Sequence, residues 1–136
     1  MFEYFEHTAD VGIRVRAPSL EQVFVEAARA LFSLLAANLD AVRPLQQIDL
    51  TIPGHQPDEL LVDWLDELLF AFSTKHLLFG QFEVVLQPDR LRATARGEPV
   101  DPDRHQVHAE VKAITYHGLK VEPANGGWLA EVIVDV

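Results

Sequence analysis

Two segments of the chain carry apolar residues at helical spacing. In the first, apolar side chains recur every three or four residues from Leu20 to Leu35, which predicts a helix with one buried face. Gln22 lies three residues after Ser19, which is the spacing of a capping box. The helix is therefore expected to begin at Ser19 and to end near Asn38.

The second predicted helix begins at Pro57–Glu59, where a proline suits the first turn and two carboxylates complement the positive helix end. Its apolar stripe extends from Leu61 to Phe72, and Lys75 and His76 suit its negative end. The acidic residues of this segment form a separate face: Asp58, Glu59, Asp63, Asp66 and Glu67.

Apolar and polar residues alternate along most of the remaining chain, which predicts strands. Asn125–Gly127 lies between two such runs and is a strong hairpin signal, and Gln87–Arg90 is typical of a second turn. Besides a short strand before Glu6, the expected strands are 11–15, 48–52, 82–87, 91–96, 107–113, 119–121 and 128–134.

These elements predict an α+β fold of two layers, in which both helices pack on one face of a mostly antiparallel mixed sheet. The length of 136 residues fits a single domain, residues 1–136, and an apolar content of 49% is enough for a hydrophobic core. The sequence has no cysteine, which excludes disulfides, thiolate metal sites and thiol nucleophiles.

Charge narrows the possible partners. Eleven basic residues stand against 21 acidic ones, for a formal net charge of -10. Little direct nucleic-acid binding is expected, because such binding depends on Lys and Arg neutralising phosphates. The apolar runs are shorter than the ~18–20 residues that cross a bilayer, and the N-terminus lacks the features of a signal peptide. We expect a cytoplasmic protein with no membrane association.

Two polar segments interrupt the strand pattern and could carry chemistry. In Glu6–Gly12, Asp10 could supply an oxygen ligand and His7 could line the same pocket, although a simple turn between strands has about equal weight. In the second segment, Lys112, Tyr116 and His117 could do acid–base or phosphate-directed work, whereas spacing alone favours a hairpin with an exposed histidine.

Two further features concentrate negative charge. Asp135 stands next to Val136, the last residue, and an aspartate beside a terminal carboxylate is unfavourable unless a cation compensates it. The acidic face of the second predicted helix most often indicates solvation alone, and its functional alternative is a docking face for a basic partner.

Four stretches of the chain together resemble the archease family, small accessory proteins of tRNA splicing. They occur in the order of the family's motifs and span nearly the whole chain: His7–Ile13, Leu61–Leu69, Lys112–Val121 and Gly127–Val136. Position 66 is Asp where the helix motif leads us to expect Asn, which adds negative charge to the helix. Residues 87–105 match no motif of the family.

The resemblance implies an activator and not an autonomous enzyme. Archease-like proteins assist the RtcB-type tRNA-splicing RNA ligase, which joins RNA 3′-phosphate and 5′-hydroxyl ends with GTP and a divalent metal. They promote guanylylation of the ligase and allow it to turn over repeatedly. The ligase is therefore the expected protein partner.

The resemblance also implies a divalent cation site. The family's metal ligands carry over to Asp10, Asp135 and Val136, with Ca²⁺ as the expected ion and Mg²⁺ or Mn²⁺ as alternatives, since oxygen donors suit hard cations. No residue is expected to be catalytic. The candidate pocket or partner-binding residues are His7, Asp63, Lys112, Tyr116 and His117.

Two other functions compete with the activator. One is a metal-dependent phosphoester hydrolase that uses Asp10, Asp135 and His117 around a cation, although these ligands are few for a site that must also activate water. The other is a chaperone-like scaffold domain with no metal role.

The charge balance makes a prediction about RNA. The isolated protein should bind tRNA weakly or not at all at physiological salt, because few basic residues are available to contact phosphates. An electrophoretic mobility shift with labelled tRNA measures this. Tight binding would contradict the argument and would direct mutagenesis to Arg90, Arg92 and Arg96, the only evident basic stripe in the sequence.

Overall fold

The computed structural model describes residues 1–7, 10–107 and 110–136. The helical elements are α1 (Leu20–Leu35), the short 3-10 helix η1 (Leu39–Ala41), α2 (Pro57–Lys75) and the short α3 (Pro102–His105). The strands are β1 (Phe2–His7), β2 (Asp10–Ala17), β3 (Gln46–Pro53), β4 (Leu77–Gln87), β5 (Arg90–Pro99), β6 (Ala113–Ala124) and β7 (Gly127–Asp135).

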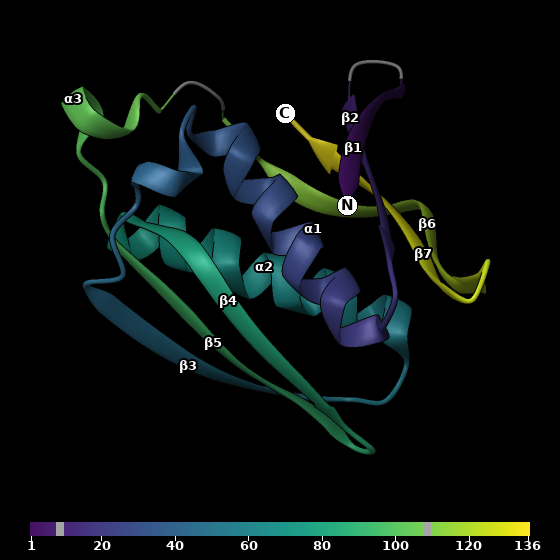
Figure 1. The fold of residues 1–136 in the computed structure, drawn as a ribbon. Helices are drawn as coiled ribbons and strands as arrows, with labels where there is room; N and C mark the ends of the chain where they lie inside the picture. The colour runs from purple at the N-terminus through teal and green to yellow at the C-terminus, as the bar shows by residue number, and fades with distance from the viewer. Residues whose placement is uncertain (8–9, 108–109) are drawn as a thin grey trace.

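The strands form two antiparallel sheets with the helices between them (Figure 1). The first sheet has the strand order β1-β2-β7-β6, and the second has the order β3-β5-β4. Helix α1 contacts β2 and β7 of the first sheet and β4 of the second, and α2 contacts β6 as well as β3 and β4.

The expected α+β class is confirmed, and the arrangement of its layers differs from the expectation. The strands divide into two sheets instead of one, and every strand pair in the described chain is antiparallel, so no mixed sheet forms. The helices consequently pack against both sheets and not on one face of a single sheet. A single sheet would have left one side of each helix uncovered, and α2 carries buried residues around most of its circumference.

The helix starts were predicted correctly. Ser19 caps α1, and its Oγ accepts a hydrogen bond of 3.2 Å from the backbone N–H of Gln22. Pro57 occupies the first turn of α2. Helix α1 ends at Leu35 and not near Asn38, because Ala36 is extended and bridges to Val107. No helix in the described part of the chain is both long enough and apolar enough to cross a membrane.

Aromatic side chains join the helices to the second sheet. The ring of Phe32 on α1 packs edge-on against Phe79 of β4, with ring centroids 5.5 Å apart, and Trp64 of α2 packs edge-on against Phe82. The buried indole Nε1 of Trp64 donates a hydrogen bond of 3.0 Å to the carbonyl oxygen of Phe24. This bond fixes α2 against α1 without leaving a buried donor unpaired.

The connection from β5 to β6 differs most from the sequence prediction. The strand expected at 107–113 is wrong for the described residues: Val107 forms an isolated bridge, and 110–112 are not in a strand. His108 and Ala109 lie outside the described residues. The short helix α3 was not predicted, and the strand expected at 119–121 belongs to the longer β6. The hairpin at Asn125–Gly126 is confirmed, and both residues have positive φ as a type I′ turn requires.

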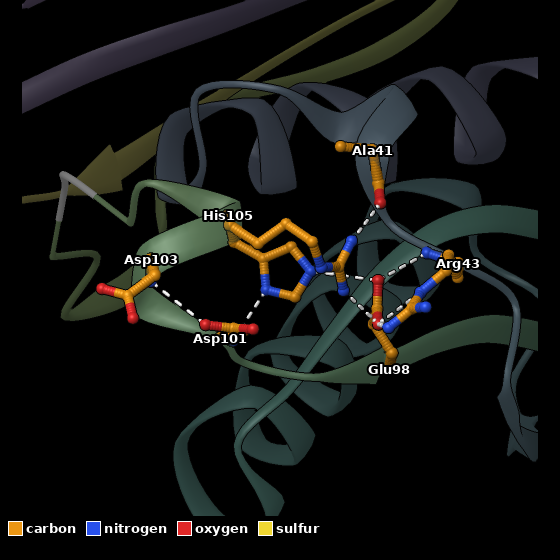
Figure 2. A network of polar contacts seen from close by, with 7 residues as sticks. Ala41, Arg43, Glu98, Asp101, Asp103 and His105 are labelled. Atoms are coloured by element: carbon orange, nitrogen blue, oxygen red, sulfur yellow. Dashed lines mark hydrogen bonds and ion pairs between the residues drawn. The ribbon is translucent and has the colours of Figure 1, made fainter.

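A buried ion-pair network holds this connection in place (Figure 2). The carboxylate of Glu98, in β5, is only 2% exposed and accepts hydrogen bonds from the backbone N–H of Arg43 at 2.7 Å and from the side chain of Arg104. His105 is fully buried and its Nε2 lies 3.0 Å from the same carboxylate. Its Nδ1 accepts from the backbone N–H of Asp101, so Nε2 carries the proton that Glu98 accepts.

These contacts favour the ionised form of the carboxylate. The hydrogen bond from Arg104, followed by those from Arg43 and His105, holds the pKa of Glu98 far below its usual range despite burial, which acts in the opposite direction. The folded chain therefore gives up this proton more readily than the unfolded chain. The resulting contribution to the free energy of unfolding is complete above about pH 4.5 and declines as the pH falls below that value.

Replacing Glu98 with Gln should lower the free energy of unfolding by about 2–3 kcal/mol near pH 7. This decrease in the free energy of unfolding is smaller than that expected on breaking a fully buried ion pair, because the guanidinium groups of Arg43 and Arg104 are partly exposed. Urea denaturation at about pH 7 and about pH 3 measures the effect, and the difference from wild type should narrow at the lower pH. Glu83→Gln, which removes an exposed carboxylate paired with Arg96, is the control and should change stability by no more than about 0.5 kcal/mol.

Candidate functional site

The outer face of the first sheet is organised in rows that cross its four strands. The side chains of residues paired across neighbouring strands point to the same face of the sheet. Successive pairs along a strand point alternately to the face covered by α1 and to the outer face. On the outer side, the rows in order along β2 are centred on Arg14, Gly12 and Asp10. Each row has a different chemistry, and the third contains the residues that the sequence indicated.

The first row is a compensated ladder of charges. Arg14 pairs in register with Glu3 and with Glu131, and its guanidinium contacts both carboxylates, at 3.2 Å and 2.5 Å. Lys120 of β6 lies 3.9 Å from Glu131. The contacts with Arg14, ahead of those with Arg16, lower the pKa of Glu3. Every carboxylate of this row therefore has a cationic neighbour.

The second row is apolar and closely packed. The ring of Phe5 lies directly on Gly12, where a Cβ atom would approach the ring to 2.3 Å. The guanidinium carbon of Arg14 lies 4.7 Å from the centre of the same ring, within the range of a cation–π contact. Ile133, the partner of Gly12 on the adjacent strand β7, is 2% exposed. Any larger residue at position 12 would therefore displace the Phe5 ring from this position.

The third row brings together carboxylates from the two ends of the chain. His7 pairs in register with Asp10, and Val11 pairs with Val134, so Asp10 lies across from Asp135 on adjacent strands. Adjacent antiparallel positions have Cα atoms about 4.5–5.5 Å apart. His7 Nδ1 lies 4.0 Å from Asp10 Oδ2, and neither Asp10 nor Asp135 makes an ion pair with a Lys or Arg of the described residues.

The third row supplies hard oxygen donors suited to a divalent cation. Asp10 is about three-quarters buried, and Val136 follows Asp135 directly at the end of β7. The backbone N–H of Lys112 donates a hydrogen bond of 2.7 Å to the carbonyl oxygen of Asp135, which fixes the end of β7. Within the described ranges, no three His, Asp or Glu side chains converge as a metal site. A cation here would therefore need an oxygen of Val136 besides the two carboxylates.

A second surface forms where β6 passes α2. Between Thr115 and Lys120 the β6–β7 register shifts, and Gly118 adopts a positive φ of 60° within this bulge. Thr115 Oγ1 donates to the carbonyl oxygen of Ile133 at 3.0 Å and accepts from the backbone N–H of His117. The bulge leaves the Tyr116 side chain 61% exposed.

The acidic face of α2 lies beside this bulge. The pKa of Tyr116 is raised, first by loss of hydration around the Tyr116 hydroxyl and then by the negative charges of Asp63 and Asp66. Partial burial, followed by the nearby charges of Asp63 and Glu67, raises the pKa of Asp66. Lys112 and Asp66 line the same surface groove next to α2. The candidate residues Asp63, Lys112 and Tyr116 therefore share one surface.

The predicted residues thus fall into two neighbouring groups. His7, Asp10 and Asp135 come together in the third row with Val136 beside them, and the second group lies along α2. His117 is exposed, and no contact within the described chain joins it to Asp10 or Asp135. Among the described residues, Asp10, Asp135 and His117 do not converge as a group that could hold a metal ion.

Sequence reasoning missed the network around Glu98. Its place in the alternation of β5 predicts an outward, exposed carboxylate, but η1 and α3 fold over this end of the strand. The available signal was weak: Arg104 and His105 follow Pro102 by two and three residues. All partners of Glu98 are internal, so the network stabilises the fold and offers no open site.

Comparison with known proteins finds relatives along the whole chain. Residues 2–136 match the model of the archease protein family (MTH1598/TM1083). The chain is 48% identical to protein archease of Methanopyrus kandleri, over 99% of each chain. It is 38% identical to protein archease of Pyrococcus furiosus, over 99% of this chain and 98% of the relative.

Two solved structures are similar to this fold. The solution structure of a Methanobacterium thermoautotrophicum protein, MTH1598, has a TM-score of 0.87 at 35% identity, covering 99% of this chain and 98% of that one. The crystal structure of a Thermotoga maritima archease, called a possible chaperone, has a TM-score of 0.67 at 21% identity, covering 100% and 98%. At that identity the second likeness shows the fold alone.

Proposed function

Because the chain belongs to the archease protein family, we propose that it activates an RtcB-type RNA ligase of tRNA splicing and is not itself an enzyme. The observation that carries this proposal is the family match over residues 2–136, which includes all four motifs of the sequence. The acidic character supports it, since a chain of net charge -10 is suited to a basic protein partner and poorly suited to RNA. The proposed place of action is the cytoplasm.

In this proposal Asp10, Asp135 and an oxygen of Val136 hold one divalent cation, with Ca²⁺ expected before Mg²⁺ or Mn²⁺. The support is electrostatic: two carboxylates lie on adjacent strands, and neither has a Lys or Arg partner within the described chain. When bound, the cation supplies positive charge and further coordination positions for oxygen ligands of the partner.

The protein's own residues have positioning roles in this proposal. The hydrogen bond from the Lys112 N–H keeps the end of β7 against β6, so that Asp135 stays across from Asp10. The Phe5 ring packs on Gly12 in the neighbouring second row. His7 lines the site next to Asp10 but is not proposed as a ligand, because hard cations prefer oxygen.

The alternative to activation is a chaperone-like scaffold role. The two functions differ in what they change. A scaffold raises the yield or lifetime of folded ligase and leaves each catalytic step unchanged, whereas an activator raises the rate of guanylylation at constant ligase concentration.

The activator should convert the ligase from single to multiple turnover when present in catalytic amounts. Guanylylation is measured with radiolabelled GTP, and turnover with an RNA bearing 3′-phosphate and 5′-hydroxyl ends. The stimulation should weaken as salt rises above about 0.1 M, where charges more than about 10 Å apart are screened. Unchanged guanylylation and turnover over a range of protein and metal concentrations would show that the assignment is wrong.

Isothermal titration with Ca²⁺ and Mg²⁺ tests the cation site independently of the ligase. Asp10→Asn should weaken binding by about tenfold or more, because it removes one of the two aspartate ligands. A C-terminal extension, which converts the Val136 carboxylate into a peptide bond, should also weaken it. Asp49→Asn, an exposed carboxylate on the other sheet, should have no effect. Equal affinity in all four proteins would rule out this site.

A further inference from the structure

A groove runs along α2 beside Lys112, the residue that precedes β6. It encloses about 430 Å³ and is lined by Asp66, Glu67, Leu69, Phe70 and Ser73 of α2 together with Lys112. Within α2, Asp63, Asp66, Phe70 and Ser73 follow one another at steps of three or four residues, so they share one face of the helix. This face is opposite to the one that carries Trp64 and Leu68 into the core.

Two aromatic side chains stand exposed on this surface. The Phe70 side chain is 63% exposed, although a phenylalanine in a helix of this length normally packs inward. Tyr116 is 61% exposed because the bulge in β6 turns it away from the core. Exposed aromatic residues beside a groove are typical of protein interaction sites and rarely serve the stability of an isolated chain.

The charge around these aromatic residues is predominantly negative, and Lys112 is the one cation among the described residues that line the groove. None of the five acidic residues Asp58, Glu59, Asp63, Asp66 and Glu67 makes an ion pair with another described residue. Elsewhere the carboxylates of Glu3, Glu98 and Glu131 are compensated by arginines. A partner that supplies positive charge to this surface would relieve the repulsion that Asp66 experiences from Asp63 and Glu67.

The outer face of the second sheet provides a contrast. It also has a shallow hollow and an exposed apolar residue, Val85, which is 52% exposed. Its charges are mixed, however: Arg92 lies in the hollow with Asp49 and Glu83, and Arg96 pairs with Glu83 at 3.3 Å. This face therefore has an exposed apolar side chain without an excess of one charge.

We propose that the groove along α2 and the surface around it dock a basic protein segment, which places an apolar side chain against Phe70 and Tyr116 and Lys or Arg side chains against Asp63, Asp66 and Glu67. The occupant is a segment of the ligase, so this inference rests on the proposed function. Lys112 lines the groove while its backbone is bonded to Asp135, so the docked segment lies next to the third row of the first sheet.

Binding of the full chain to the ligase, followed by fluorescence anisotropy, tests the groove directly. Asp63→Asn combined with Asp66→Asn should weaken binding by about tenfold at ~50 mM NaCl, and the difference should shrink at ~500 mM NaCl. Phe70→Ala should also weaken binding by about tenfold, and this loss should persist at high salt, because it removes apolar contact and not charge. All three positions are at the surface, so thermal melting of the variants should stay close to that of wild type.

The matched controls lie on the second sheet. Asp49→Asn combined with Glu83→Gln removes the same number of charges, and Val85→Ala removes an apolar residue of comparable exposure. Both should bind the ligase as wild type does. The proposed docking site is wrong if the groove variants bind the ligase as tightly as wild type does, or if the control variants lose as much affinity as the groove variants. Activation of the ligase by wild type would still support the proposed function in that case.

Two other outcomes would also overturn the proposal. If wild type activates no ligase and binds none, the proposed function fails together with the docking site. If Phe70→Ala abolishes self-association in analytical ultracentrifugation and leaves ligase binding unchanged, the surface belongs to a contact between copies of this chain. Loss of ligase binding in the groove variants, with the controls intact, supports the proposal.

Discussion

The antiparallel pairing of β2 with β7 is the constraint on which the rest of the structure depends. It joins a strand near the start of the chain to the last strand, in the register that pairs Ile13 with Val132. Both side chains are buried against α1. A slip of one residue would turn these apolar side chains to solvent and carry Arg14 and Asp10 into the core. The same register therefore determines the core of the first sheet and the chemistry of its outer face.

Negative charge is compensated in some parts of this molecule and left uncompensated in others. Arg14 lies between Glu3 and Glu131 in the first row, whereas Asp10 and Asp135 have no such neighbour in the third row. The acidic residues on the outer face of α2 make no ion pair within the described chain either, although Lys112 lines the groove beside them. Because neighbouring carboxylates raise each other's free energy, these two regions are where a cation or a basic partner would gain most. They adjoin each other through Lys112, whose backbone holds Asp135 while its side chain lines the groove.

Among the described residues, the group with the largest pKa shift lies in neither region. Glu98 is buried, and its carboxylate is fully engaged by Arg43, Arg104 and His105. A strongly shifted pKa often indicates a functional site, but an ion pair whose partners are all internal shifts a pKa for structural reasons. Here the network fixes α3 and η1 against β5. It therefore determines the position from which the chain continues after α3 to β6. Its effect on the third row is therefore indirect.

The sequence by itself determined what depends on neighbours along the chain. Ser19 and Pro57 marked the helix starts, and Asn125–Gly126 marked the hairpin, because caps and tight turns are decided by a few consecutive residues. The α+β class also followed, since the periods of two and 3.6 residues are local properties. The resemblance of four motifs, and not the periodicity, indicated that Asp10 and Asp135 belong together.

Only the tertiary structure decided how the strands were grouped and which charges were buried. Nothing in the alternation of 46–53 or 90–99 distinguishes two sheets from one, because strand pairing depends on which elements meet after the helices pack. Glu98 was buried by η1 and α3, which are distant in sequence or too short to predict. The bulge that exposes Tyr116 arises from a register shift between β6 and β7. Each of these features results from contacts between separate segments, and the sequence pattern of one segment carries no information about its distant partner.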